Sequence, residues 1–299
     1  MMKFAQNQKI YKIGDILIGG QPGENPTVLM GSIFYQGHRI VSDPDKGIFD
    51  RQKAKALLDR EAELSAETGN PRIIDVIGDT TQALINYVEF VAANCSSPIL
   101  VDSSLQKVRM ETIRHFANTD LAPRLVYSSL EDHYSEEELA CIKDCGIRSA
   151  IVLAFSAKTI RPRDRIKLLK ENLLDAAQRA GLENVLVDTG VLDVPSVSWA
   201  TQAIWEIKNT LGCPSGCAPA NAIYTWKRLK ARGSPAFEVG ASSVLVLPIS
   251  WGADFILYGP IGSAPWVYLA CAAMDAMLAY GGQTIGIRAP QTHPLYKIF

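Results

Sequence analysis

The chain has 299 residues, of which 47% are hydrophobic, and its formal net charge at neutral pH is −1. This length is enough for one large domain or two small ones, and so balanced a charge gives no electrostatic basis for binding nucleic acid or an anionic membrane surface. The N-terminal residues lack the apolar core of a signal peptide, so we expect a cytoplasmic protein.

The first predicted elements are a short hairpin, a buried strand and a helix. Residues 10–24 contain two short apolar runs separated by Gly14 and Asp15, a pattern typical of a β-hairpin. Residues 27–33 predict the first core strand, and a polar loop follows them. The next helix is expected over residues 50–68, where one apolar stripe recurs at helical spacing.

From residue 70 onwards, apolar runs of strand length alternate with helical segments. Further strands are predicted at residues 73–77, 98–102, 125–128, 149–155, 185–188, 212–217 and 255–258. Further helices are predicted at residues 81–94, 105–118, 135–146, 163–180, 197–211, 222–232 and 266–280. Eight strands that alternate with helices over this length predict an α/β protein with a TIM (β/α)8 barrel. We expect residues 1–299 to form a single domain, with the hairpin at its N-terminus.

The main rival fold is a doubly wound parallel sheet. That fold predicts a glycine-rich loop after the first strand, where a nucleotide phosphate would bind. The corresponding residues here, 35–38, have the sequence YQGH and do not match a nucleotide-binding fingerprint. The barrel is therefore favoured.

One segment near the C-terminus is notably apolar. Residues 266–278 are too few to span a membrane and include Asp275, so we expect a buried helix and no integral membrane segment.

Polar side chains stand at the C-terminal ends of the predicted strands. Asp75, Asp102 and Asp188 end three apolar runs, Ser128 ends a fourth, and Asn221 follows the seventh strand. An Asp after a strand can simply cap the next helix. In a barrel, however, the C-terminal ends of all strands meet around one pocket, and the repetition favours a shared site.

The three carboxylates could in principle hold a hard metal cation. Each of them stands alone in the sequence, and none of the four histidines lies at the end of an apolar strand. The cysteine pairs at 141/145 and 213/217 also lack the two-residue gap that is typical of zinc ligands. We therefore expect no bound metal.

Hydrogen-bond recognition of a flat, nitrogen-rich ring fits these residues better. A carboxylate accepts two parallel hydrogen bonds from an N–H and an amino group at adjacent ring positions. Two acids on different strands could hold two edges of a pterin. The amide of Asn221 can both donate and accept, so it tolerates a ring nitrogen in either protonation state.

Five segments, spread over almost the whole chain, carry a family resemblance: residues 18–24 (IGGQPGE), 31–35 (GSIFY), 45–50 (DKGIFD), 151–155 (IVLAF) and 254–261 (DFILYGPI). They resemble the family of the H subunit of tetrahydromethanopterin S-methyltransferase. They are most similar to its soluble bacterial relatives, which methylate tetrahydrofolate from a methylated corrinoid. This resemblance implies the barrel of the pterin-binding methyltransferases.

The resemblance also implies roles for five residues. In the wider pterin-binding group, an Asp after the third strand and another after the sixth bind the pterin, and these positions fall on Asp102 and Asp188. A polar residue after the second strand corresponds to Asp75. The Asn that approaches the methyl-accepting nitrogen falls on Asn221, the expected catalytic residue. Ser128 stands where the group has an Asn, so a water or its neighbour Tyr127 is expected to complete the hydrogen bonds.

The implied activity is that of a methyltransferase in one-carbon metabolism. It would move a methyl group between a methylated corrinoid, either methylcobalamin or a corrinoid protein, and N5 of tetrahydrofolate to give methyltetrahydrofolate. We find no cobalamin-binding signature in the chain, so a separate corrinoid protein is the expected partner. The resemblance also implies a homodimer.

The residues leave three alternatives open. The chain could be the H subunit of a membrane-associated tetrahydromethanopterin:coenzyme M methyltransferase complex, with tetrahydromethanopterin as the pterin. It could be a non-catalytic subunit that docks a corrinoid protein. It could also be a transferase on the same barrel that resembles dihydropteroate synthase.

Overall fold

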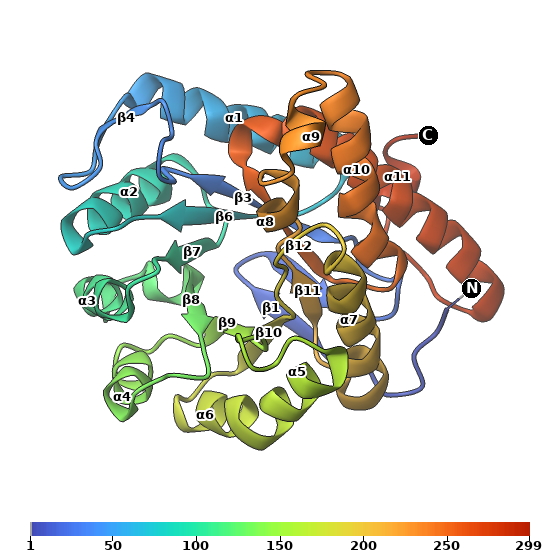
Figure 1. The fold of residues 1–299 in the computed structure, drawn as a ribbon, viewed down its shortest axis with the longest axis horizontal. Coiled ribbons are helices and arrows are strands. Elements are labelled where there is room, and N and C mark those ends of the chain that lie inside the picture. The colour runs from blue at the N-terminus through green and yellow to red at the C-terminus, as the bar shows by residue number, and fades with distance from the viewer. Residues whose placement is uncertain (1) are drawn as a thin grey trace.

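A computed structural model of the chain, which describes residues 2–299, contains a closed barrel of eight parallel strands (Figure 1). Around the barrel the strands follow the order β10-β11-β12-β3-β6-β7-β8-β9. Their bounds are Val28–Ile33 (β3), Arg72–Ile77 (β6), Ile99–Asp102 (β7), Leu125–Leu130 (β8), Ser149–Leu153 (β9), Asn184–Asp188 (β10), Ser215–Cys217 (β11) and Phe255–Pro260 (β12). The predicted TIM barrel is thereby confirmed.

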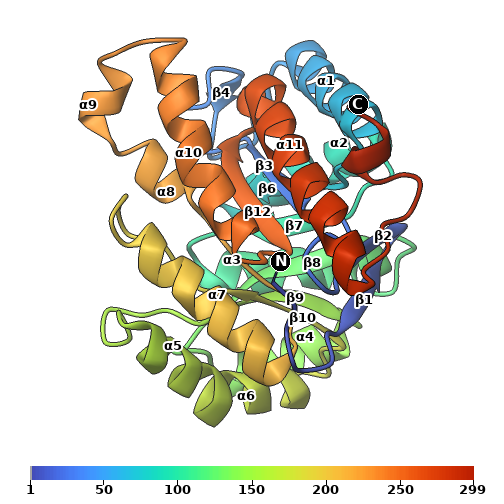
Figure 2. The same cartoon turned by 90° about the vertical axis from the view of Figure 1, so that its right-hand side faces the viewer.

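Helices form an outer layer around the strands, as both views of the ribbon show (Figures 1 and 2). The α-helices are Arg51–Thr68 (α1), Thr81–Asn94 (α2), Gln106–Phe116 (α3), Glu136–Asp144 (α4), Pro162–Leu168 (α5), Leu174–Arg179 (α6), Val197–Leu211 (α7), Ala220–Ile223 (α8), Lys227–Lys230 (α9), Ala236–Ser250 (α10) and Ala264–Gly282 (α11). A π-helical turn, Leu169–Leu173 (η2), joins α5 to α6. Short 3-10 turns occur at Ala122–Arg124 (η1), Ile261–Ser263 (η3), Gln283–Ile285 (η4) and Pro294–Tyr296 (η5).

The predicted N-terminal hairpin closes one end of the barrel. Strands β1 (Ile10–Ile13) and β2 (Ile16–Gly19) pair antiparallel, and Ile13 and Ile18 are buried in the same cluster as the residues of the barrel interior. The N–H of Lys9 donates to the carbonyl of Gly212, just before β11 begins. The hairpin therefore covers the N-terminal ends of the strands and leaves their C-terminal ends open.

The barrel interior is a layer of apolar side chains with polar groups above it. Successive side chains of a strand alternate between its two faces, so a residue two positions beyond an interior residue also points inward. The interior residues of β6, β7 and β10 are Ile73, Leu100 and Leu186. Two positions beyond them stand Asp75, Asp102 and Asp188. The alternation that places apolar side chains in the barrel interior therefore also places these three acids inside the barrel, at its open C-terminal end.

Several elements differ from the prediction. The helix predicted at residues 222–232 is two short helices, α8 and α9. The polar loop after β3 contains a small antiparallel pair, β4 (Val41–Asp43) and β5 (Ile48–Phe49). Helix α10 was not predicted, because the exposed side chains of Val239 and Leu247 obscure its buried stripe and Pro248 lies inside it. Helix period can be recognised only where the two faces differ in polarity.

The C-terminal helix α11 is longer than predicted. With its flanking turns, residues 261–285 are long and apolar enough to cross a membrane by length and composition, so the expectation that this segment is too short was wrong. Half of the 18-residue apolar stretch within this segment is buried, and the helix packs against α1 and α10. The buried carboxylate of Asp275 accepts hydrogen bonds from Thr27 and Asn70, which tie α11 to the start of β3.

Candidate functional site

A cavity of about 350 Å³ lies at the C-terminal end of the barrel. The structure brings all five residues singled out in the sequence into its wall: Asp75, Asp102, Ser128, Asp188 and Asn221. Ser32, at the end of β3, joins them. Sequence reasoning missed Ser32, although it follows the interior residue Met30 by two positions and the same alternation could have identified it.

Asp75 and Asp102 form a coupled pair of acids on neighbouring strands. The hydroxyl of Ser32 donates to Oδ2 of Asp75 at 2.5 Å, whereas the buried Oδ1 accepts no hydrogen bond from residues 2–299. Burial raises the pKa of Asp75 to about 6. Burial and then the charge of Asp75 raise the pKa of Asp102 well above its usual range. Ionising one carboxyl therefore makes it harder to ionise the other.

Asp188 lies on β10 and is 7% exposed. Its Oδ1 accepts the N–H of Gly190 at 2.7 Å, which holds the carboxyl group in one orientation. Burial raises the pKa of Asp188 to about 6, and the hydrogen bond from Gly190 and the charge of Arg165 oppose that shift. Oδ2 accepts no hydrogen bond within the described part of the chain, so it is available to a ligand.

Asn221 lies at the junction between this cavity and a second hollow. It is an exposed residue in the first turn of α8. The second hollow has a volume of about 780 Å³, and Asn221 lines both spaces. Tyr35, Tyr224 and Lys230 lie on the outer side of that hollow. A group held next to Asn221 can therefore be approached from outside the barrel.

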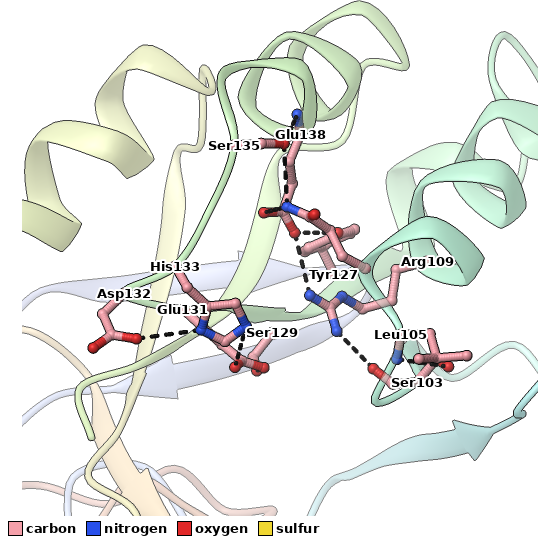
Figure 3. A network of polar contacts seen from close by, with 11 residues as sticks. Ser103, Leu105, Arg109, Tyr127, Ser129, Glu131, Asp132, His133, Ser135 and Glu138 are labelled. Carbon is pink, nitrogen blue, oxygen red and sulfur yellow. Dashed lines mark hydrogen bonds and ion pairs between the residues drawn. The ribbon is translucent and has the colours of Figure 1, made fainter. Parts of the chain in front are cut away.

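A buried network behind β7 and β8 supports the cavity wall (Figure 3). The guanidinium of Arg109 donates to the carbonyl of Ser103 at 2.6 Å and to Glu138 at 3.3 Å. The hydroxyl of Tyr127 donates to the same Glu138 carboxylate at 2.5 Å. Tyr127 thus points away from the cavity. Of the two groups expected to complete the hydrogen bonds of Ser128, a water or Tyr127, the expectation for Tyr127 was wrong.

The described residues 2–299 contain no group of three or more His, Cys, Asp or Glu side chains that could hold a metal ion. All six cysteines are free thiols, and five of them are buried.

The acid pair predicts a pH-dependent cost in stability. Because the pKa of buried Asp75 is above that of an unfolded Asp, ionising it disfavours the folded state. This cost is absent below about pH 4, develops between pH 4 and 6, and is complete above that. We expect Asp75→Asn to stabilise the ligand-free protein by about 1–3 kcal/mol at pH 8 and by much less at pH 4.5. Urea unfolding at the two pH values measures the difference.

Asp120→Asn is the matched control, since Asp120 is an exposed residue outside the cavity. Equal effects of Asp75→Asn at both pH values would contradict the assigned pair.

Comparison with known families gives one clear result. The family model described as "Tetrahydromethanopterin S-methyltransferase MtrH subunit" matches residues 6–289. The chain is 36% identical to the H subunit of tetrahydromethanopterin S-methyltransferase from Methanopyrus kandleri, with 97% of each chain covered. It is 33% identical to the same subunit from Methanocaldococcus jannaschii, with both chains covered in full. It is also 34% identical to the H subunit of the putative methyltransferase mtx from Methanosarcina mazei, with 99% of each chain covered.

Dihydropteroate synthases are among the similar solved structures. The enzyme of Xanthomonas albilineans with 4-aminobenzoic acid superposes with a TM-score of 0.63 at 15% identity, over 92% of this chain and 99% of that one. The enzyme of Thermus thermophilus in complex with 6HMPPP gives a TM-score of 0.57 at 16% identity, over 90% of this chain and 99% of that one. At these identities the likeness shows a shared barrel fold.

Proposed function

The chain belongs to the family of the H subunit of tetrahydromethanopterin S-methyltransferase, and from this membership and the cavity we propose that it transfers a methyl group between a methylated corrinoid and N5 of a reduced pterin. The observation that carries the proposal is the convergence of three acids and one amide on a single cavity. The curated relatives named above are methyltransferase subunits, and two of them carry tetrahydromethanopterin in their names. These names favour tetrahydromethanopterin, the alternative acceptor, over the tetrahydrofolate of our main expectation.

The acids offer what a pterin ring needs. The ring presents an N–H beside an amino group on one edge, and a carboxylate can accept from both. Asp188 has a free Oδ2 for one such contact, and Asp75 has a buried Oδ1 that accepts no hydrogen bond from the described residues. A buried acceptor without a partner is costly, and a ligand donor would remove that cost. The raised pKa of Asp102 favours its protonated form, which can donate a hydrogen bond to a ring nitrogen.

The chemical step needs alignment more than a base. The lone pair of the neutral N5–H group attacks the methyl carbon in line with cobalt, the new N–C bond forms, and the electron pair of the broken cobalt–carbon bond stays on cobalt. The methylated nitrogen then releases its proton to water. The metal passes from Co(III) to Co(I). Unprotonated N5 is already nucleophilic, so the protein contributes by positioning the reactants and excluding water. We assign to Asn221 the role of orienting N5 and stabilising its developing charge.

The position of Asn221 supports delivery of the corrinoid from outside. Asn221 is exposed at the point where the cavity opens into the hollow beside Tyr35 and Tyr224. We propose that a separate corrinoid protein presents its methyl group there. The relatives are named as subunits, so we also propose that the chain acts with partner proteins in the cytoplasm, at the periphery of a larger assembly. The homodimer remains a prediction.

One assay tests the proposed function. Methylcobalamin is mixed with the purified protein and either tetrahydromethanopterin or tetrahydrofolate, and loss of the methyl–cobalt absorbance is followed. We expect turnover with a larger kcat/KM for tetrahydromethanopterin. Turnover with tetrahydrofolate alone would restore the main expectation.

Two further arms distinguish methyl transfer from dihydropteroate synthesis and from docking alone. Pterin pyrophosphate with 4-aminobenzoate should give no product if the activity differs from that of dihydropteroate synthase. Binding of a corrinoid protein without binding of either reduced pterin would indicate a docking role and would refute the proposed catalytic activity.

A further inference from the structure

Arg165, in α5, is a buried cation behind the loop that follows β10. Its side chain has no exposed surface. Nη1 donates to the carbonyl of Thr189 at 2.6 Å and to that of Gly190 at 3.0 Å, and Nε donates to the carbonyl of Ile160 at 3.0 Å. Thr189 and Gly190 are the two residues directly after Asp188. The guanidinium therefore fixes the loop that orients this acid.

The charge of Arg165 has no close counterion in the described part of the chain. No carboxylate oxygen lies within 4 Å of it there, and its Nη2 has no hydrogen-bond partner. The other buried arginine near the cavity, Arg109, contacts the carboxylate of Glu138. A buried charge without a partner is costly, so the position of Arg165 requires an explanation.

Asp188 is the acid beside the loop that Arg165 holds, and the charge of Arg165 opposes the rise in its pKa that burial causes. Of the groups that face Asp188, the thiol of Cys217 on β11 is buried and its pKa is raised well above the ordinary value, so it stays neutral. The N–H of Gly190 contributes a hydrogen bond but no net charge. Across the cavity lie Asp75 and Asp102, whose pKa values are both raised, and Arg109 lies behind Asp102. Among these groups, Arg165 is therefore the cation that lies nearest in the fold to Asp188, behind the loop that follows it.

Local packing keeps Arg165 in place. The ring of Phe155, after β9, lies against the guanidinium, with the Arg165 Cζ atom 5.0 Å from its centroid. Gly190 has a φ of +71°, and a Cβ atom added to it would lie 2.4 Å from Phe155. Only glycine can bring the loop this close to the ring.

We propose that Arg165 is a positioning residue of the pterin site, which fixes the loop after β10 and supplies a positive charge that favours the ionised form of Asp188. This inference rests on the proposed function, because it assumes that Asp188 binds the pterin. It assigns to Arg165 an effect on ligand binding in addition to its effect on folding.

The test compares a neutral and a charged substitution. Arg165→Gln keeps a hydrogen-bond donor and removes the charge, whereas Arg165→Lys keeps the charge and loses the forked geometry. Binding of tetrahydromethanopterin and of tetrahydrofolate is measured by calorimetry between pH 5 and 8. For the wild type, affinity should fall with decreasing pH as Asp188 and Asp75 become protonated, and only the contribution of Asp188 should depend on Arg165.

We expect Arg165→Gln to weaken binding at pH 7 by about 10–100-fold and to move this loss of affinity to higher pH, because removing a nearby cation raises the pKa of an acid. Arg165→Lys should weaken binding and leave the pH dependence in place. Arg124→Gln is the matched control. Arg124 also donates to two backbone carbonyls, those of Cys95 and Ser97, but these lie near the opposite end of the barrel.

An unchanged pH dependence in Arg165→Gln, with an affinity loss no larger than in Arg124→Gln, would overturn the inference. If Arg165→Gln fails to fold, Arg165→Lys decides: wild-type affinity in that variant also overturns it, whereas weaker binding with the wild-type pH dependence supports it. Absence of pterin binding by the wild-type protein would instead refute the proposed function.

Discussion

Asn221→Ala is expected to lower kcat by about 10²–10³-fold while changing the affinity for the reduced pterin by less than about tenfold. Asn221 is exposed at the opening of the cavity, so its amide contributes little to burial of the ring. We expect the amide of Asn221 to stabilise N5 chiefly in the transition state, when the nitrogen gains positive charge. An interaction made mainly in the transition state lowers kcat and kcat/KM together when it is removed.

Steady-state kinetics with methylcobalamin, together with calorimetric titration of the pterin, separates the two effects. Gln36→Ala is the control, since Gln36 is an exposed residue of the neighbouring hollow and has no assigned role. Equal losses in turnover and in affinity would remove the transition-state role of Asn221.

Asp188→Asn should weaken pterin binding by about 10–100-fold, which corresponds to about 1.5–3 kcal/mol for a lost charge-assisted hydrogen bond. The carbonyl oxygen of the new amide can still accept the N–H of Gly190, so the loop is expected to keep its conformation. The amide nitrogen would then face the cavity and present a donor to the donor edge of the ring. Calorimetry with either reduced pterin measures the loss.

Asp193→Asn is the matched control for this variant. Asp193 lies in the same loop five residues further on, and its Oδ1 accepts the N–H of Ser196 at the protein surface. An affinity of Asp188→Asn equal to that of this control would show that Asp188 does not bind the pterin.

Much of the site could be predicted because it follows from strand periodicity. Asp75, Asp102 and Asp188 each stand two positions beyond an interior residue, and this spacing is visible in the sequence before any tertiary contact is known. Helix α1 was equally predictable, since Asp50 caps its first turn and Gly69, with a φ of +84°, ends it. Such local signals act within a few residues and need no long-range partner.

Helices α10 and α11 could not be predicted fully from the local pattern of apolar residues. Both carry apolar side chains on exposed faces, such as Leu247 on α10 and Leu269 on α11, so their periodicity is weak. Which side of each helix is buried depends on contacts between α10, α11 and α1. These partners are distant in the sequence, and their packing decides the length and orientation of both helices.

The sequence by itself therefore determined the barrel, the open end of its strands and the acids that point into it, because alternation along a strand is a local property. Only the tertiary structure decided which charges these acids meet. The raised pKa values of Asp75 and Asp102 and the unpaired cation of Arg165 arise where separate strands and helices converge. Electrostatic interactions depend on distance and burial in the folded protein, and no spacing along the chain specifies either of them.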